Sequence, residues 1–312
     1  MNISKLEEII SKDKIKYDEP LKNHTSFRTG GPADVLISVS DVRELLCVLK
    51  FVEDEKVPYF LLGNGSNVLA SDAGFRGAII KLEGEFLEVK TDGEFIGAGA
   101  GVTLSKLANA AMNASLSGLE FASGIPGTLG GALFMNAGAY GGEMCRVVTK
   151  VKALDVEALK NGAKNPEDAI LEILNEDMKF GYRRSVLKEK GYVALSCEMK
   201  LEKSDSAKIK ETMLDLNKRR KEKQPLEFPS AGSTFKRPEG YFAGKLIEDA
   251  GLGGYTIGGA QVSEKHKGFI INTGNASSKD IKSLMDHVTE TVKNQSGVTL
   301  EPEVIFLGSF DN

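Results

Sequence analysis

The spacing of apolar residues along the chain predicts alternating helices and strands. An apolar run at residues 35–39 predicts a strand, and the period of 3.6 that follows predicts a helix over residues 41–56. The same criteria predict helices over residues 104–114, 207–221, 243–250 and 278–294, and strands over residues 59–62, 78–80, 94–96, 193–201 and 304–307. Asp41 with Glu44 resembles a capping box, and Gly251 is placed to end a helix.

Length and charge describe an ordinary globular protein. The 312 residues are enough for two domains, and the Ser204-Asp-Ser206 stretch is a plausible junction. The formal net charge of −4 does not favour nucleic acid as a partner. The basic cluster at residues 218–223 lies at the end of a predicted helix, where cations are favoured anyway.

No targeting or metal signal stands out. Residues 1–17 lack the apolar core of a signal peptide, and no apolar run is long enough to span a bilayer, so we expect a cytoplasmic protein without membrane contact. The three cysteines, Cys47, Cys145 and Cys197, have no metal or redox spacing, and we expect no metal centre, although carboxylates alone could still hold Mg²⁺. Cys47 is predicted to pack on the apolar side of the first helix.

A glycine loop follows the predicted strand at residues 59–62. It reads Gly63-Asn-Gly-Ser-Asn-Val-Leu69. Such a loop can present a cup of backbone N–H groups to a pyrophosphate, because glycine adds no side-chain bulk. No Gly-Lys-Ser/Thr and no amphipathic helix follows, which excludes a nucleoside-triphosphate P-loop. A plain turn between strands is the alternative.

A second segment concentrates glycine in apolar sequence. Eight glycines lie between residues 118 and 142, among residues such as Ile125, Leu129 and Phe134 that are not typical of linkers. Glycine is unfavourable in regular structure, so this density indicates close approach of the main chain to a large flat ligand.

A third glycine stretch, Gly97-Ala-Gly-Ala-Gly101, superficially resembles a dinucleotide-binding fingerprint. Its spacing is Gly-x-Gly-x-Gly, and no strand ending in an acidic residue follows at the expected offset. We therefore interpret these small residues as a device for close strand packing.

Seven segments in order resemble the UDP-N-acetylenolpyruvoylglucosamine reductase family, also called UDP-N-acetylmuramate dehydrogenases. They are Asn23-His-Thr-Ser-Phe-Arg-Thr-Gly-Gly31, the Gly63–Leu69 loop, Gly124-Ile-Pro-Gly-Thr-Leu-Gly-Gly131 with Met135-Asn-Ala-Gly-Ala-Tyr-Gly141, Tyr182-Arg-Arg-Ser185, Gly232-Ser-Thr-Phe-Lys-Arg-Pro238, Gly258-Gly-Ala-Gln-Val262 and Glu301-Pro-Glu-Val304. The segments span almost the whole chain.

The resemblance implies an α+β fold with a two-part FAD-binding domain of the vanillyl-alcohol-oxidase type and a C-terminal α+β substrate-binding domain. We expect the FAD domain at residues 1–204, with lobes divided near 80–90, and the substrate domain at 205–312. Packing of the last strand, about 298–312, back on the flavin domain is left open.

The resemblance also implies an NADPH-dependent flavoenzyme of peptidoglycan precursor synthesis, and so of cell-wall biogenesis, cell shape and division. NADPH reduces the flavin and leaves, and UDP-N-acetylglucosamine enolpyruvate then takes its place. Hydride addition to the terminal enolpyruvyl carbon leaves an enolate that needs cations, hydrogen-bond donors and a proton at the α-carbon. The product is UDP-N-acetylmuramate, and we expect a monomer.

By motif position, the resemblance implies three catalytic residues. Arg183 holds the substrate carboxylate, Ser233 donates the proton, and Glu303 is the partner acid. From the residues alone, Arg183 could equally be a surface arginine beside Arg184, Ser233 a turn or cap residue, and Glu303 a solvated strand-end carboxylate.

Binding residues follow from the same motifs. Those for FAD are Gly63, Asn64, Gly65, Ser66, Asn67, Ser123, Gly124, Pro126, Gly127, Thr128, Gly130, Gly131 and Ala137. Those for the substrate are Lys223, Lys236 and Arg237, with Tyr182 and Gln261 as weaker candidates.

Two features depart from the family pattern, and two other functions remain open. The chain lacks the loop with a lid tyrosine that a longer family form carries, and residues 155–178 are more helix-like than a simple hairpin. A flavin oxidase or dehydrogenase with another substrate would share the glycine loops. A nucleotide-sugar-binding regulator without redox activity would purify colourless.

Overall fold

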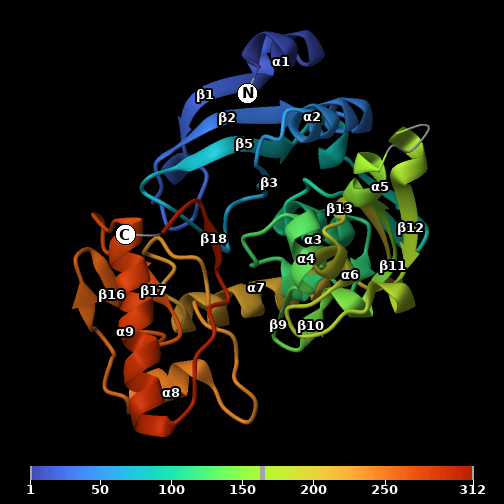
Figure 1. Cartoon of the computed structure of the whole chain (residues 1–312). Helices are drawn as coiled ribbons and strands as arrows, with labels where there is room; N and C mark the ends of the chain where they lie inside the picture. Colours follow the sequence, from blue (N-terminus) through green and yellow to red (C-terminus); the bar gives the residue numbers. More distant parts are fainter. Residues whose placement is uncertain (1, 162–165, 311–312) are drawn as a thin grey trace. The chain divides into compact units, whose positions relative to one another are not determined.

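The computed structural model describes residues 2–161 and 166–310 and is shown in Figure 1. It contains two compact units. The first comprises Met1–Lys16, Leu36–Gly63 and Ala78–Arg219, and the second comprises Tyr17–Val35, Asn64–Gly77 and Arg220–Asn312. Neither unit is therefore one continuous stretch of sequence.

A five-stranded antiparallel sheet organises the first unit. Its strand order is β12-β11-β13-β7-β6, and its members are β6 (Val89–Asp92), β7 (Phe95–Gly99), β11 (Val148–Leu154), β12 (Ile170–Leu174) and β13 (Val193–Lys200). Side chains alternate between the two faces of each strand, so Ile96, Val151 and Met199 are buried on one face while Lys152 on the other is exposed.

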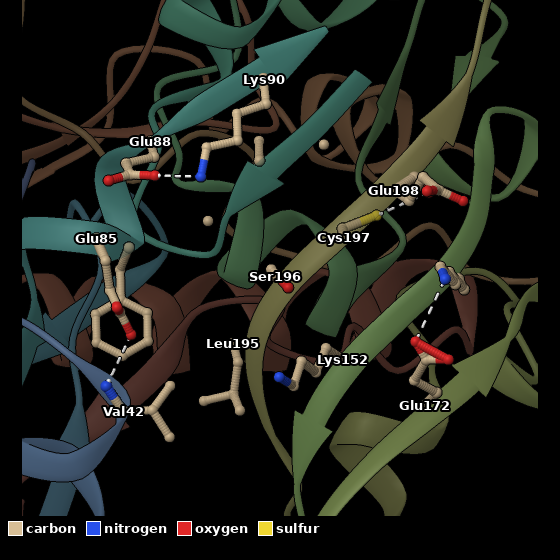
Figure 2. A pocket seen from close by; sticks show the side chains of 15 residues that line it. Val42, Glu85, Glu88, Lys90, Lys152, Glu172, Leu195, Ser196, Cys197 and Glu198 are labelled. Carbon is tan, nitrogen blue, oxygen red and sulfur yellow. Dashed lines mark hydrogen bonds and ion pairs between the residues drawn. The ribbon is translucent and has the colours of Figure 1, made fainter. Parts of the chain in front are cut away.

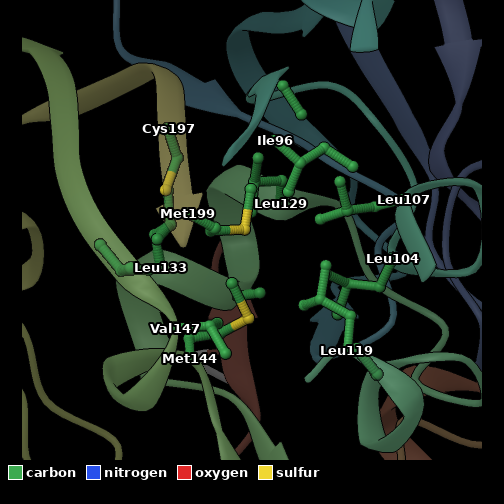
Figure 3. Packing of buried hydrophobic residues seen from close by; sticks show 14 of the residues in the cluster. Ile96, Leu104, Leu107, Leu119, Leu129, Leu133, Met144, Val147, Cys197 and Met199 are labelled. Atoms are coloured by element: carbon green, nitrogen blue, oxygen red, sulfur yellow. The ribbon is translucent and has the colours of Figure 1, made fainter. Parts of the chain in front are cut away.

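The buried face of this sheet forms the core of the first unit (Figure 3). Helices α3 (Leu104–Asn113) and α4 (Leu129–Met135) contribute Leu104, Leu107, Leu129 and Leu133, each fully buried. Residues far apart in sequence meet there, and they fix the two helices against the sheet. Burial of each large apolar side chain contributes roughly 1.5–3 kcal/mol.

The helix predicted over residues 41–56 is confirmed as α2 (Val42–Asp54). Asp41 caps it by accepting from the Glu44 N–H at 2.8 Å. The capping box is only half formed, because the Glu44 carboxylate accepts from the Ser40 N–H instead of the Asp41 N–H. The prediction for Cys47 is wrong: Cys47 is exposed, because the buried face of α2 runs through Leu45, Val48 and Val52.

Strands near the N-terminus form a four-stranded sheet of order β1-β2-β5-β3. Its members are β1 (Ile15–Pro20), β2 (Pro32–Val39), β3 (Tyr59–Leu61) and β5 (Phe75–Leu82). β3 pairs in parallel with β5, which requires the chain between them to cross back before it enters β5. The predicted strands at 35–39, 59–62 and 78–80 are thus confirmed, and β1 was not predicted.

The second unit is built on a three-stranded sheet and two helices. The sheet has the order β15-β16-β17, with β15 (Thr256–Ile257), β16 (Ala260–Val262) and β17 (Ile270–Asn272), and the helices are α8 (Ala243–Asp249) and α9 (Ser278–Ser296). β18 (Ile305–Leu307) pairs in parallel with β4 (Val68–Ala70). The core combines Ile247, Leu284 and Val288 with the fully buried Phe27 and Leu69.

Helix α9 is capped twice at its N-terminus. Ser277 and Asp280 form a complete capping box. The Asp72 carboxylate accepts from the N–H groups of Ser278 and Lys279 at 2.9 and 3.1 Å. Negative charge at this end of a helix is favourable, because the first N–H groups lack partners within the helix.

The remaining α-helices and strands that the structure describes are short, apart from α7 (Ser206–Lys223), which confirms the helix predicted over residues 207–221. They are α1 (Ile3–Ile9), β8 (Leu116–Ser117), β9 (Gly138–Ala139), β10 (Gly142–Glu143), α5 (Val156–Lys160), α6 (Val186–Lys190) and β14 (Glu202–Lys203). Residues 155–178 include α5 and β12, so this stretch does hold both helical and extended structure, as expected.

Candidate active site

The two predicted flavin loops meet in the first unit. A Cβ atom added at Gly63 would stand 2.5 Å from the Thr128 hydroxyl oxygen, so the approach requires glycine. Thr128 is the N-cap of α4, and its hydroxyl accepts from the Gly131 N–H at 3.4 Å. The first residue of the first loop therefore lies against the N-terminus of α4, the helix that follows the second loop.

Segment 127–130 packs on the third glycine stretch. The Leu104 N–H donates to Gly127 O at 3.0 Å, and the Gly130 N–H donates to Ala100 O at 2.8 Å. A Cβ atom would stand 2.3 Å from Phe86 O at Gly99 and 2.7 Å from Leu82 O at Gly101. The close-packing interpretation is confirmed at these two glycines. It is wrong for Gly97, where a Cβ atom would meet only Lys90 O at 4.0 Å.

The rest of the first loop belongs to the second unit. Gly65 has a φ of +60°, and a Cβ atom there would stand 2.1 Å from His24 O. The Ser26 N–H donates to Gly65 O at 3.1 Å, which fixes the loop to the Asn23–Gly31 segment. In the part of the chain that the structure describes, the N–H groups of Gly65, Ser66 and Asn67 have no protein acceptor. Donors of this kind fit a phosphate.

Backbone pairing places Glu303 opposite Thr234, the residue after Ser233, in the second unit. The Glu303 N–H donates to Thr234 O at 2.8 Å, and the Lys236 N–H donates to Glu301 O at 2.8 Å. Segments 234–236 and 301–303 therefore run antiparallel. Thr234 is fully buried, and its hydroxyl accepts from the Ile270 N–H at 3.0 Å, which anchors the segment to β17.

Asn67 links the first glycine loop to this pair. Its side-chain amide donates to Glu303 O at 3.1 Å, and its own carbonyl accepts from the Ile305 N–H at 2.9 Å. The motif position of Asn67 predicts an FAD contact and does not predict this contact with Glu303. The contact holds the backbone of a predicted catalytic acid beside a predicted cofactor loop.

The three basic residues predicted to bind the substrate's phosphate or carboxylate differ in their surroundings. Lys236 pairs with Glu301 at 2.8 Å, and this hydrogen bond holds the pKa of the exposed Glu301 carboxyl below its usual value. The Arg237 guanidinium lies 3.9 Å from the centre of the exposed Phe242 ring. The exposed Lys223 has no hydrogen-bond or ion-pair partner among the described residues.

Gln261 and two of the predicted flavin residues make hydrogen bonds that are mostly local, although the Ser123 hydroxyl also accepts from the Asn217 side-chain amide at 3.3 Å. The Gln261 amide donates to Gly254 O at 3.4 Å and to Thr256 Oγ1 at 3.2 Å, within its own hairpin. The Ser123 hydroxyl donates to Glu120 O at 2.9 Å, and Ala137 O accepts from the Met144 N–H at 3.0 Å. The described contacts therefore tie Gln261 to the β15–β16 hairpin and not to Ser233 or Glu303.

Arg183 lies on a tight loop of the first unit, beside Tyr182. Gly181 and Arg184 close the loop with two backbone hydrogen bonds of 3.1 and 3.2 Å. Arg184 pairs with Glu189, whereas the half-buried Arg183 lies over the Tyr182 ring at 5.1 Å. The two neighbouring arginines thus differ in their surroundings. Because Ser233 and Glu303 belong to the other unit, their meeting with Arg183 stays a prediction.

A separate cavity of about 490 Å³ lies in the first unit (Figure 2). It stands over the polar face of the five-stranded sheet, lined by Lys90, Lys152, Ser196 and Glu198 among others. None of the predicted site residues lines it. Several of its charges pair with one another, such as Glu88 with Lys90 at 2.8 Å and Lys150 with Glu172 at 3.3 Å.

Residues 2–161 and 166–310 contain no group of three or more His, Cys, Asp or Glu side chains arranged to hold a metal ion. Within the same ranges, none of the helices has both the length and the apolar character that crossing a bilayer requires.

Two family models match parts of this chain. A family model described as "FAD binding domain" matches residues 33–158, and one described as "UDP-N-acetylenolpyruvoylglucosamine reductase, C-terminal domain" matches residues 224–307. The chain is similar to the UDP-N-acetylenolpyruvoylglucosamine reductase of Caldanaerobacter subterraneus subsp. tengcongensis, with 52% identity over 98% of both chains. It is 51% identical to that of Clostridioides difficile, over 96% of this chain and 95% of the relative.

A solved structure shows the same fold. The crystal structure of UDP-N-acetylenolpyruvylglucosamine reductase from Thermus caldophilus matches with a TM-score of 0.77 and 35% identity, covering 93% of this chain and 97% of the other. Fold and sequence together define an FAD-dependent oxidoreductase of the α+β class. With about half of its residues shared over nearly the full length, the chain belongs to the UDP-N-acetylenolpyruvoylglucosamine reductase family.

Proposed function

We propose that this chain uses NADPH to reduce UDP-N-acetylglucosamine enolpyruvate to UDP-N-acetylmuramate, as a cytoplasmic monomer of peptidoglycan precursor synthesis. The observation that carries the proposal is the pairing of segments 234–236 and 301–303, which holds Glu303 next to the Ser233 segment. Asn67 of the flavin loop donates to Glu303 O from the other side. In this proposal, hydrogen bonds to the backbone therefore connect the flavin loop, the segment of the proton donor and the acid.

The residues present fit FAD. Gly63 approaches Thr128 at a distance that excludes any side chain, and the N–H groups of Gly65, Ser66 and Asn67 are available to a pyrophosphate. When bound, FAD supplies hydride transfer from NADPH to the enolpyruvyl double bond. The protein supplies orientation and electrostatics. In this assignment residues 1–204 hold the cofactor and residues 205–312 hold the nucleotide sugar.

Arg183 is assigned to the substrate carboxylate. Addition of hydride to the terminal carbon places negative charge on the α-carbon and the carboxylate, so the charge on this group nearly doubles. A guanidinium fork binds a planar carboxylate through two parallel hydrogen bonds, which lysine cannot do. Fixed positive charge in a dry site then stabilises the developing enolate.

Ser233 is assigned to protonate the α-carbon. A hydroxyl is a weak acid, so this role requires a strongly basic acceptor, which an enolate carbon provides. Gly232, at a φ of +74°, turns the chain immediately before the serine. Glu303 is the partner acid beside it. Lys223, Lys236 and Arg237 are assigned to the diphosphate or carboxylate, with Tyr182 and Gln261 in secondary roles.

Replacement of the proton donor tests the function. Ser233→Ala should leave flavin reduction by NADPH nearly unchanged and slow flavin reoxidation by the enolpyruvyl nucleotide by about 10²- to 10⁴-fold, the usual contribution of a positioned proton donor. Anaerobic stopped-flow absorbance of the purified flavoprotein measures both steps separately.

The control is Ser296→Ala, an exposed serine at the end of α9 in the same unit, which should leave both rates at the wild-type level. Equal damage to both steps in Ser233→Ala would contradict the proton-donor role. Failure of the enolpyruvyl nucleotide to reoxidise the wild-type flavin would contradict the proposed function itself.

A further inference from the structure

The loop that carries Arg183 needs support from outside itself. Arg183 has a φ of +55°, in the left-handed region that only glycine, and to a lesser degree asparagine, adopts readily. Backbone strain of this kind persists where the surrounding structure imposes it, and it occurs preferentially at functional sites. The bonds between Gly181 and Arg184 close the loop but do not attach it to anything else.

Ser185 attaches one end of the loop to helix α4. Its side chain is fully buried, and its hydroxyl donates to Phe134 O, near the C-terminus of α4, at 2.8 Å. Ser185 is the N-cap residue of α6, yet among the described residues its side chain makes no capping hydrogen bond. The hydroxyl of an N-cap serine normally accepts a hydrogen bond from an N–H group of its own helix. The Ser185 hydroxyl instead donates to a carbonyl of another helix, α4.

Asn136 attaches the other end. It follows α4 in the left-handed conformation, with a φ of +45°, and is 4% exposed. Its side-chain amide donates to Gly181 O at 3.3 Å and to Glu143 Oε2 at 3.2 Å, and its amide oxygen accepts from the Cys145 N–H at 3.0 Å. Asn136 lies in a motif shared with the family, but the motif predicts no role for it.

Helix α4 therefore joins two predicted functional loops within the first unit. Its N-cap is Thr128, against Gly63, and its C-terminal end holds both ends of the Arg183 loop. The helix has seven residues, so the two loops are about 10 Å apart along a rigid element.

We propose that Asn136 and Ser185 are positioning residues that hold Arg183 at a fixed place relative to Thr128 of the second predicted flavin loop and so determine how strongly the enzyme binds the substrate's carboxylate. The proposal rests on the proposed function. Two parallel hydrogen bonds between guanidinium and carboxylate require a defined orientation, and a misplacement of about 1 Å can reduce rates by about 10²-fold. Release of either end of the loop lets Arg183 leave its strained conformation.

Ligand binding tests the proposal without relying on turnover. The FAD-loaded protein is titrated by calorimetry with UDP-N-acetylmuramate, which carries the carboxylate, and with UDP-N-acetylglucosamine, which lacks it. In Ser185→Ala the preference for the carboxylate ligand should fall by about 10-fold, as expected for loss of an oriented charged contact. If the residue had only a structural role, the variant would bind both ligands more weakly to the same extent, or it would lose FAD.

Thr149→Val is the matched control. In the wild-type protein the Thr149 hydroxyl, like that of Ser185, donates to a backbone carbonyl in the first unit, Glu198 O at 3.0 Å. Thr149 is not part of the Arg183 loop. This variant should keep the wild-type preference. Asn136→Gly is the second test variant, because glycine is the favoured residue after a helix end and keeps the backbone conformation while removing the amide.

A double-mutant cycle assigns the effect to Arg183. In an Arg183→Ala background, Ser185→Ala and Asn136→Gly should change the ligand preference no further, since the group they position is gone. If both variants keep the wild-type preference, or lower it equally with and without Arg183, the positioning role is overturned. A wild-type protein without any preference would instead overturn the assigned role of Arg183, and this inference with it.

Discussion

Arg183 and Asn136 share the left-handed backbone conformation, for different reasons. Asparagine tolerates it after a helix end, whereas arginine has no intrinsic reason to adopt it. The motif showed which arginine to consider, because Tyr182-Arg-Arg-Ser185 resembles a family segment. Neither strain nor attachment to α4 could be predicted, because both depend on contacts with residues about 50 positions away.

Backbone strain at Arg183 predicts an unusual order of stability. Arg183→Gly should be more stable than Arg183→Ala by about 1 kcal/mol, because glycine adopts a positive φ without the penalty of a Cβ atom. Urea denaturation of the two variants measures the difference. Both should lose the preference for the carboxylate ligand, so the comparison isolates the backbone. An alanine variant as stable as the glycine variant would contradict strain at this position.

Gly63 predicts a specific effect on the cofactor. Gly63→Ala would place a methyl group 2.5 Å from the Thr128 hydroxyl and so separate the two loops that are proposed to bind the flavin. We expect the purified variant to retain substantially less FAD, measured as the ratio of flavin absorbance to protein. Gly97→Ala is the control, since its methyl group would meet only Lys90 O at 4.0 Å. Full FAD content in Gly63→Ala would contradict the tight approach.

Among the elements, long amphipathic helices were the easiest to predict. α2 and α9 have a clear period and polar caps in sequence. α4 was not predicted, because it has seven residues and two glycines, Gly130 and Gly131, in its first turn. The second N-terminal cap of α9 could not be predicted from the sequence either, because Asp72 lies 206 positions before Ser278. The pairing of Ser233 and Glu303 segments depended on the family resemblance alone.

The capping box of α9 predicts a pH dependence of stability. Burial favours the neutral acid, but hydrogen bonds from the Ser277 and Gly259 N–H groups and the Ser277 hydroxyl outweigh it and hold the pKa of Asp280 below its ordinary 3.8. A carboxyl with a lowered folded pKa stabilises the fold fully above its unfolded pKa and loses that contribution as pH falls through the folded pKa.

Asp280→Asn should therefore lower the melting temperature at pH 7. The difference from wild type should shrink as the pH falls below about 4, because the wild-type carboxylate then takes up its proton. Scanning calorimetry from pH 3 to pH 7 measures both. A difference that is constant across this range would show that the charge of Asp280 contributes nothing to α9.

Over the whole molecule, the order of the seven segments was enough to predict the family, the α+β class and FAD, and the comparisons confirm all three. The way in which the chain passes between the two units was not predictable, because the sequence does not show which distant apolar residues a buried apolar residue will contact. Phe27 and Leu69 are fully buried in the same core as Ile247 and Leu284, although the sequence suggested a boundary near residue 204.

This path predicts that residues 205–312 do not fold alone. The fragment would lack Phe27 and Leu69 from its core, the β4 partner of β18 and the Asp72 cap of α9. We expect no cooperative thermal transition by circular dichroism, whereas the full chain, as control, should melt cooperatively. A sharp transition in the fragment would show that the C-terminal part is an autonomous domain.

The hydrogen bond from Asn67 to Glu303 joins residues 236 positions apart. On a translating ribosome, the glycine loop emerges long before the acid that it holds, and contacts so distant in sequence form late because a long loop must close first. A stalled or truncated nascent chain that ends before residue 301 can thus carry the glycine loop without Glu303. By the assignment proposed above, such a chain is incomplete as a catalyst however well its earlier parts fold.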